Sequence, residues 1–294
     1  MAKLISIGQI IDRTWEIYST NFKSLMKISM WAFLVGIFVI IRLLLLPSGE
    51  TAAIQEIMGT NPEQTLIIGF AIAVAISIFA IPITSIWVYM NLVRGVDNSI
   101  AKKKYSTKEL GRQSWRDFLP YLWVMILKNI ANVLPILLIV PGAILLILSL
   151  MYNGVAINSI GLLLTFLGTV AALVMVIWLG VRLTFAGYAM LLDGKGGLTS
   201  LKESFRVTEG RFWASLWRII IPKLVFGSGV LVAEILLGLI LPLLVGSLYN
   251  LGPTFGLYAG LTITVALTTG LRVLYPPLFI IADELLYGSL KQTR

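Results

Sequence analysis

The chain of 294 residues contains no cysteine and no histidine. Disulfide bonds, thiolate nucleophiles, imidazole acid–base catalysis and metal sites built on Cys or His ligands are therefore excluded. Charged residues are also scarce: they make up 13% of the chain, whereas a soluble domain carries about 25%. The few charged side chains that lie among apolar residues are therefore the first candidates for a function.

The sequence is instead rich in hydrophobic residues, which form long apolar segments. Hydrophobic residues make up 58% of the chain, and the mean hydropathy is +0.92. A helix that crosses a hydrocarbon core of ~30 Å needs about 20 consecutive apolar residues. Six segments are at least this long, namely Met26–Leu46, Leu66–Leu92, Tyr121–Leu150, Ile157–Leu192, Leu216–Leu248 and Phe255–Leu286. The sequence predicts an all-α polytopic membrane protein with six transmembrane helices, in which residues 1–294 form a single integral membrane domain.

The net charge of +9 is distributed unevenly among the segments that connect the predicted spans. Lys and Arg lie before span one, between spans two and three, between spans four and five, and after span six. The other connections contain neither residue, namely Pro47–Thr65, Met151–Ala156 and Tyr249–Thr254. By the positive-inside rule, this pattern predicts a multi-pass protein of the cell (cytoplasmic) membrane with both termini in the cytoplasm.

The same distribution indicates what the basic residues contact. Each Lys or Arg near the membrane surface is attracted to anionic lipid headgroups by about 1 kcal/mol. We interpret the charge as a topology signal and as attraction to anionic lipid on the cytoplasmic side, and not as a nucleic-acid site. The predicted partners are the lipid bilayer and, as a further option, another protein.

Two cytoplasmic segments of the chain resemble each other. Ser106–Trp123 (STKELGRQSWRDFLPYLW) and Ser200–Trp217 (SLKESFRVTEGRFWASLW) share seven of eighteen residues without a gap, and Ile10–Lys27 is a weaker third candidate. Each precedes a pair of predicted spans, which indicates three parallel units, residues 1–95, 96–192 and 193–294. Many alternating-access transporters have inverted repeats instead, so the pattern weakens a transporter interpretation. Chance similarity among amphipathic helices is the alternative.

The three segments predict cytoplasmic amphipathic helices before spans one, three and five. Apolar residues recur every three or four positions and leave the charges on the other face, as in helices that lie in a membrane interface. The apolar face is expected in lipid or against the helix bundle, and an ordinary linker helix packed on the bundle is the alternative. The aromatic residues expected at the interface are Trp15, Phe22, Phe118, Phe205, Phe212 and Trp213.

Polar residues inside a membrane span are costly, and they often mark a functional site. The candidates are Lys128, Asn129, Asn132, Arg182, Glu234 and Arg272. Glu234 and Arg272 belong to adjacent antiparallel spans, so the two side chains are expected either as a buried ion pair or in a substrate- or proton-linked role. Arg182 is a rival partner for Glu234. In span three, Pro135 and Pro141 should kink the helix, so that nearby polar groups line a cavity or bond to neighbouring helices.

No group of residues indicates an enzyme. The chain has no histidine to serve as the base of a serine hydrolase, no paired carboxylates within the membrane, and no glycine-rich phosphate loop. The sequence therefore predicts no catalytic residues, no cofactor and no metal site.

The segment Arg182–Ile219, RLTFAGYAMLLDGKGGLTSLKESFRVTEGRFWASLWRI, resembles the membrane domain associated with glycerophosphoryl diester phosphodiesterases and related bacterial six-span proteins. The residues that carry the resemblance are Arg182, Asp193, Gly194, Leu201, Lys202, Ser204, Gly210, Arg211, Phe212 and Trp213. The phosphodiesterase activity of such proteins belongs to a separate soluble barrel with histidines and metal-binding acids, which this chain does not encode. The resemblance therefore implies a stand-alone membrane domain in a bacterial cytoplasmic membrane.

Two functions are consistent with the sequence. The first is a non-enzymatic membrane protein that organises the membrane or binds a partner through its interfacial amphipathic helices. The alternative is a transporter or channel for a small or lipid-like substrate that uses Arg182, Glu234 and Arg272.

Overall fold

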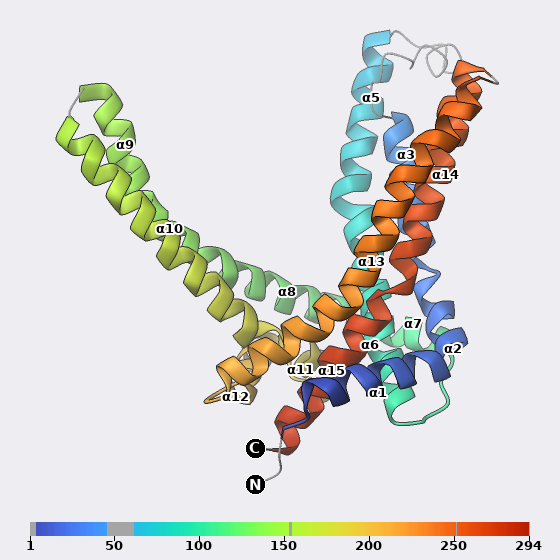
Figure 1. The fold of residues 1–294 in the computed structure, drawn as a ribbon, viewed down its shortest axis with the longest axis horizontal. Coiled ribbons are helices and arrows are strands. Elements are labelled where there is room, and N and C mark those ends of the chain that lie inside the picture. Colours follow the sequence, from blue (N-terminus) through green and yellow to red (C-terminus); the bar gives the residue numbers. More distant parts are fainter. Residues whose placement is uncertain (1–3, 46–61, 153–154, 251, 294) are drawn as a thin grey trace. The chain divides into compact units, whose positions relative to one another are not determined.

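The computed structural model describes residues 4–45, 62–152, 155–250 and 252–293. Every regular element in this part of the chain is helical (Figure 1). Two short elements, η1 and η2, are π-helical and 3₁₀-helical respectively. In chain order the elements are α1 (Ile7–Thr20), α2 (Phe22–Ser29), α3 (Ala32–Leu45), α5 (Pro62–Ala75), η1 (Ile76–Ala80), α6 (Ile81–Ile100), α7 (Thr107–Arg116), α8 (Phe118–Val133), η2 (Leu134–Ile139), α9 (Val140–Tyr152), α10 (Val155–Leu183), α11 (Ala186–Asp193), α12 (Gly197–Val207), α13 (Phe212–Tyr249), α14 (Pro253–Leu274) and α15 (Pro276–Gln292).

Six helical segments of the described chain are long and apolar enough to cross a membrane. They are Phe22–Arg42, Ile67–Ile100, Phe118–Met151, Ile157–Asp193, Phe212–Leu248 and Tyr258–Gln292. Each overlaps one of the expected spans, so the prediction of an all-α polytopic membrane protein with six spans is confirmed. Many large hydrophobic side chains on these helices are exposed, as expected for helices surrounded by lipid, whose tails are as apolar as leucine.

The chain divides into two compact units. The α9–α10 unit comprises Met1–Ile7, Arg116–Ile220 and Asp283–Arg294. The α3–α14 unit comprises Gly8–Trp115 and Ile221–Ala282. The long helices α13 and α15 therefore contribute residues to both units.

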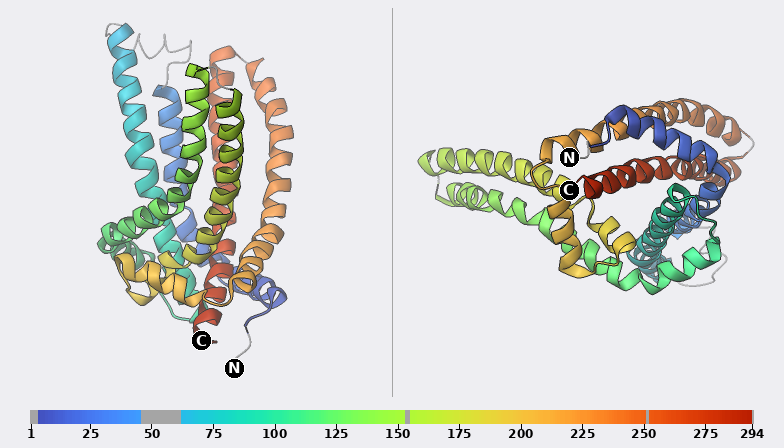
Figure 2. Two further views of the ribbon diagram at one scale, coloured as in Figure 1. Left: turned by 90° about the vertical axis from the view of Figure 1, so that its left-hand side faces the viewer. Right: turned by 90° about the horizontal axis from the view of Figure 1, so that it is seen from below.

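A long helical hairpin is the main feature of the α9–α10 unit, with η2 and α9 packed along α10 (Figure 2). Glycines allow the two backbones to approach closely. A Cβ atom on Gly142 of α9 would lie 2.3 Å from the backbone nitrogen of Thr165, and one on Gly168 of α10 would lie 2.3 Å from a carbonyl oxygen of η2. Small residues at such contacts are typical of helix pairs inside membranes.

Prolines interrupt two of the spans, as expected from the sequence. Pro135 lies in η2, which separates α8 from α9 within span three. A proline has no N–H to donate and its ring crowds the preceding turn, so the α-helical bonding pattern is lost there. Span six is interrupted at Tyr275, and α15 begins at Pro276. The break expected at Pro135 in span three is therefore confirmed, and a second break lies in span six.

Helix α3 is central to the α3–α14 unit, because it packs against α5, α6 and α14. Helix α2 leads into α3 and packs against α6 and α14. Just before α3, the ring of Trp31 packs edge-on against Trp87 of α6, with ring centroids 5.6 Å apart. Spans one, two and six thus meet around the junction between α2 and α3.

Helices α1, α7 and α12 occupy the three segments expected to be amphipathic. In each copy the helix that enters the span begins at the same aligned phenylalanine: α2 at Phe22, α8 at Phe118 and α13 at Phe212. Buried positions also coincide, because the aligned residues Thr14, Leu110 and Ser204 are at most 3% exposed. These coincidences support the threefold repeat of residues 1–95, 96–192 and 193–294, which stays a prediction.

Helices α7 and α12 are each hydrogen-bonded to the span that precedes them along the chain. Helix α1, which has no preceding span, is hydrogen-bonded to the last span. The bonds are Tyr18 Oη to Leu274 O (3.0 Å), Arg94 Nη1 to Ser114 Oγ (2.9 Å) and Phe185 N to Ser204 Oγ (3.1 Å). Each of the three helices is therefore hydrogen-bonded to a span other than the one that it leads into, twice within the α3–α14 unit and once within the α9–α10 unit.

Candidate functional site

A cleft of about 540 Å³ lies within the α3–α14 unit. Its volume falls in the range of about 300–1,000 Å³ that is typical of small-molecule sites. Residues from α2, α3, α6, α14 and the first turn of α15 line the cleft, namely Ser29, Ala32, Val35, Gly36, Val39, Ser85, Val88, Tyr89, Leu92, Val265, Thr268, Thr269, Arg272, Val273 and Pro276. The cleft is therefore bounded by spans one, two and six.

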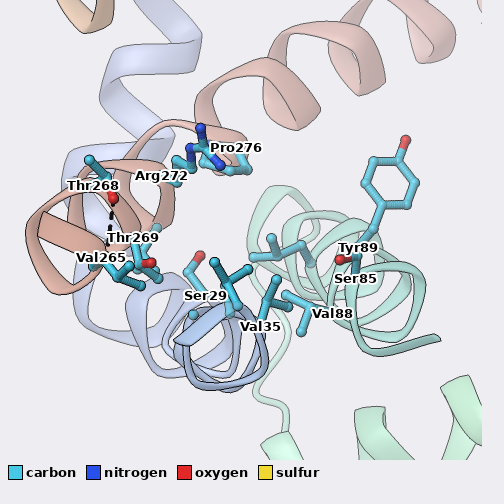
Figure 3. Close-up of a pocket in the computed structure, with 15 residues that line it drawn as sticks. Ser29, Val35, Ser85, Val88, Tyr89, Val265, Thr268, Thr269, Arg272 and Pro276 are labelled. Atoms are coloured by element: carbon cyan, nitrogen blue, oxygen red, sulfur yellow. Dashed lines mark hydrogen bonds between the residues drawn. The ribbon is translucent and has the colours of Figure 1, made fainter. Parts of the chain in front are cut away.

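The cleft has a polar end formed by α2 and the last turn of α14. Arg272 supplies the charge there, and its exposed side chain makes no hydrogen bond or ion pair with any described residue. Ser29 is 1% exposed, and its buried Oγ also has no hydrogen-bond partner in the described part of the chain. In Figure 3 the Ser29 hydroxyl and the Arg272 side chain border the same opening. Two hydrogen-bond donors are thus uncommitted at one end of the cleft.

Valine side chains from three helices form the apolar part of the cleft. Val35 and Val39 come from α3, Val88 from α6 and Val265 from α14. The wall between α3 and α14 depends on Gly36, because a Cβ atom there would lie 2.8 Å from the hydroxyl oxygen of Thr269. The lack of a side chain at this position therefore allows α14 to lie close to α3.

Two other hydroxyl groups of the lining, those of Thr268 and Tyr89, are bonded or directed elsewhere. Thr268 Oγ1 donates to the carbonyl oxygen of Thr264 in its own helix, at 2.8 Å. The ring of Tyr89 points away from Arg272 in Figure 3. No Asp or Glu lines the cleft, so the electrostatic character of the described lining is set by Arg272 alone.

An ion pair between Glu234 and Arg272, one of the two roles expected from the sequence, is not formed. Both side chains are exposed, and neither has an ion-pair partner among the described residues. The physical reason is that α14 packs chiefly against α3 and not against α13, its neighbour along the chain. Glu234 lies on α13 outside the lining of the cleft.

Arg182 lies in the α9–α10 unit, and its contacts there are specific. Its Nη1 donates to the carbonyl oxygen of Phe205 at 3.1 Å, and its guanidinium lies 5.4 Å from the ring centroid of Trp178. Its Nε is buried without a hydrogen-bond partner in the described chain. The side chain thus holds α12 to the end of α10, and its pairing with Glu234 stays a prediction.

The polar residues of span three lie on α8, also in the α9–α10 unit. Lys128 is partly exposed, and Asn129 is exposed. Asn132 lies two residues before the 3₁₀ segment, and its Oδ1 atom is buried without a hydrogen-bond partner among the described residues. Of the six predicted polar residues, only Arg272 lines the cleft.

The aromatic residues expected at the interface divide into three groups by exposure. Trp15 (58%), Phe22 (40%) and Trp213 (68%) are exposed. Phe205 and Phe212 are half-buried. Phe118 is 8% exposed, so its expected place in the lipid interface is corrected: this side chain packs inside the protein at the start of α8.

Some polar residues of the motif that carries the family resemblance connect helices by hydrogen bonds. Asp193 accepts hydrogen bonds from Tyr287 Oη (2.5 Å) and Lys291 Nζ (2.8 Å). Ser204 Oγ donates to the carbonyl oxygen of Arg182 at 2.5 Å. Asp193, Arg182 and Ser204 are part of the motif that carries the family resemblance, so these members of the motif serve packing in the structure.

Sequence reasoning missed the cleft and a buried polar network on α6 and α7. Arg94 is 8% exposed, and its Nη1 donates to Ser114 Oγ, which in turn donates to Asn91 Oδ1 at 3.2 Å. In the sequence, Arg94 lies just after the expected span Leu66–Leu92, where a basic residue indicates a cytoplasmic connection. For Ser29 no sequence signal existed, since lone serines are common where a span begins.

The described residues contain no group of three or more Asp and Glu side chains placed to hold a metal ion. The fold and the cleft together define the class: a multi-pass α-helical membrane protein with a ligand-sized cleft between spans. Comparison with protein-family models, with curated proteins and with solved structures gives no match.

Proposed function

We propose that the protein is a non-enzymatic integral membrane protein that organises lipid at the cytoplasmic surface through α1, α7 and α12. The observation that carries the proposal is an exposed tryptophan on α1 and on α7, and a third at the start of α13, the helix that follows α12. Trp15 on α1 is 58% exposed, Trp115 on α7 is 56% exposed, and Trp213, just after α12, is 68% exposed. Tryptophan is enriched at membrane interfaces because its ring is apolar and its N–H is polar.

Exposed basic residues on the same helices support the proposal. They are Arg13 on α1, Lys108 and Arg112 on α7, and Lys202 and Arg206 on α12. Each contributes about 1 kcal/mol of attraction when it lies near an anionic membrane surface. The side of α12 that packs on the protein is instead mostly polar, with Ser200, Glu203 and Ser204 buried beside Val207. One of its apolar residues, Leu198, is 61% exposed and thus available to lipid.

The resemblance of Arg182–Ile219 to the membrane domain of glycerophosphoryl diester phosphodiesterases fits this role. The proposed setting is a bacterial cytoplasmic membrane, with both termini in the cytoplasm and anionic headgroups as the main partners. A protein partner that binds the same helices is the other outcome to be tested.

Depth-dependent fluorescence quenching tests the proposal. The protein is reconstituted in lipids brominated at different acyl positions, and the signal of Trp15 is obtained as the difference between the wild type and Trp15→Phe. Trp213→Phe gives the same difference for α13, and Trp87→Phe, which removes a half-buried ring, is the control. The proposal requires both exposed rings to be quenched most by shallow bromines. If water-soluble iodide quenches both rings and brominated lipid quenches neither, then α1 and the start of α13 do not touch the membrane, and the proposal fails.

A transporter or channel for a small or lipid-like substrate is the second candidate. The cleft favours this candidate, because it places an uncommitted arginine between three spans. Flux of candidate solutes into proteoliposomes, compared among wild type, Glu234→Gln and Arg272→Gln, tests the alternative. If no form carries flux and the variants are as stable as the wild type, transport is rejected.

A further inference from the structure

We propose that the cleft between α3, α6 and α14 binds one anionic phospholipid. In this arrangement the phosphate lies on Arg272 and Ser29, and one acyl chain lies along the valines of the three helices. The site is separate from the interfacial helices, so the inference does not rest on the function proposed above.

The polar end of the cleft has the donors that a phosphate group needs. A guanidinium offers N–H groups in a planar fork that matches phosphate oxygens, and it keeps its charge at any physiological pH. The Arg272 guanidinium is not engaged by any described residue. Ser29 is 1% exposed, and its buried hydroxyl lacks a partner in the described chain. A buried hydroxyl is normally hydrogen-bonded, so an unpartnered one beside a cleft indicates a missing acceptor.

The charge of the lining favours an anionic headgroup. Arg272 is the only charged residue in the described lining. A zwitterionic headgroup carries a cation that would need a carboxylate or an aromatic ring close to the phosphate site. No carboxylate lines the cleft, and Tyr89 directs its ring away from Arg272 in Figure 3. An anionic headgroup without a cationic arm therefore fits these residues best.

The apolar end explains why the ligand is a lipid and not a free anion. Val265 lies seven residues before Arg272 on α14, which is about 10 Å at 1.5 Å per residue. From the polar end, the valines of α3, α6 and α14 thus line a path that runs along the spans. Water-soluble anions such as inorganic phosphate gain nothing from such walls. An acyl chain, by contrast, buries its surface there, and lipid surrounds the helices on which the cleft lies.

Native mass spectrometry of the purified protein tests the site. Detergent-solubilised protein is incubated with equal amounts of phosphatidylglycerol and phosphatidylcholine, and the retained lipid is identified and counted. The wild type should retain one phosphatidylglycerol in preference to phosphatidylcholine. Arg272→Gln should weaken this binding by about tenfold or more, since a hydrogen-bonded charge is lost. Ser29→Ala should weaken it less, and Val265→Trp should abolish it by filling the apolar end while Arg272 remains.

Arg42→Gln is the matched control, because Arg42 is another arginine of these spans and does not line the cleft. Its phosphatidylglycerol binding should equal that of the wild type. Thermal unfolding in detergent checks that each variant is folded, and Arg272 makes no hydrogen bond or ion pair with a described residue that its replacement would remove. Unchanged binding in folded Arg272→Gln and Val265→Trp overturns the proposal. Equal retention of both lipids overturns the anionic specificity, and displacement of the lipid by inorganic phosphate shows a site for soluble anions.

Discussion

Ser204 shows what a single hydroxyl contributes at the residue scale. Its Oγ accepts the backbone N–H of Phe185 and donates to the carbonyl oxygen of Arg182. The helix α10 ends at this point and α11 begins, so backbone groups would otherwise lack partners. The serine is fully buried and belongs to the duplicated segment, where its sequence context is that of a helix on the surface.

Ser204→Ala should lower the free energy of unfolding by about 1–3 kcal/mol, because a buried N–H loses its acceptor. Ser200→Ala is the matched control: Ser200 is equally buried, but its Oγ bonds only to the nearby carbonyl oxygen of Gly197. Unfolding of both variants in detergent, followed by circular dichroism, measures the difference. An equal decrease in the free energy of unfolding of both variants would mean that the hydrogen bonds of Ser204 to α10 and α11 do not add to the stability.

Tyr18 adds a pH-dependent contact between α1 and α14. Its hydroxyl donates to the carbonyl oxygen of Leu274 at 3.0 Å, and burial raises the pKa of Tyr18 above its ordinary value of about 10. The neutral phenol is therefore favoured in the folded state. Its contribution is complete below pH ~10 and is lost as the pH rises from there through the folded-state pKa.

Tyr18→Phe removes both the bond and the titration. At pH 8 the variant should be less stable than the wild type by about 1 kcal/mol, the usual net worth of a hydrogen bond. Between pH 10 and 12 the difference should shrink, because the wild type alone loses this contribution. Parallel unfolding curves across the pH range provide the measurement. A difference that grows with pH contradicts the assignment.

At the scale of elements, the sequence predicted where helices lie better than which faces they bury. The six spans, the breaks at Pro135 and Pro276, and the helices before spans one, three and five follow from hydropathy, proline chemistry and helical spacing. The buried face of α12 could not be predicted in this way, because serine and glutamate, the residue types at Ser200, Glu203 and Ser204, are usually found on a protein surface. In a membrane protein the exposed face is apolar, so hydrophobicity no longer identifies the inside.

The hairpin of α9 and α10 gives a prediction at the same scale. Gly168→Ala should destabilise the protein by about 1–3 kcal/mol, since a methyl group would collide with the backbone of η2 and force the helices apart. Gly180→Ala on the same helix meets nothing within 4 Å. It should be neutral, or stabilising by up to ~1 kcal/mol through helix propensity. Thermal unfolding of the two variants in one detergent compares them. Equal thermal stability of the two variants would show that the close approach of α10 to η2 does not contribute to stability.

For the whole molecule, sequence predicts the number of spans and the polarity of their connections, yet only part of the candidate site. Arg272 stood out as a charge in an apolar stretch. Its partner was sought on α13, the next span along the chain, whereas α14 packs against α3. Packing between helices far apart in the sequence depends on shape at residues such as Gly36, and one sequence does not reveal it. Ser29 entered the site only through that packing.

The topology makes a further prediction, and the absence of native cysteine makes it easy to test. Lys103→Cys lies in a connection rich in lysine, and Asn250→Cys lies in one without basic residues; both positions are exposed. A membrane-impermeant maleimide should label Asn250→Cys in intact cells and Lys103→Cys only after the membrane is permeabilised. Labelling of Lys103→Cys in intact cells reverses the proposed orientation.

The central claim is that the cations of α1, α7 and α12 gather anionic lipid at the membrane surface. Electron spin resonance of spin-labelled lipids in reconstituted vesicles measures the preference of the protein for phosphatidylglycerol over phosphatidylcholine. The wild type should prefer the anionic lipid, and high salt should reduce the preference. A variant with Arg13, Lys108, Arg112, Lys202 and Arg206 changed to glutamine should lose most of it while remaining folded. An unchanged preference in that variant, or no preference in the wild type, contradicts the claim.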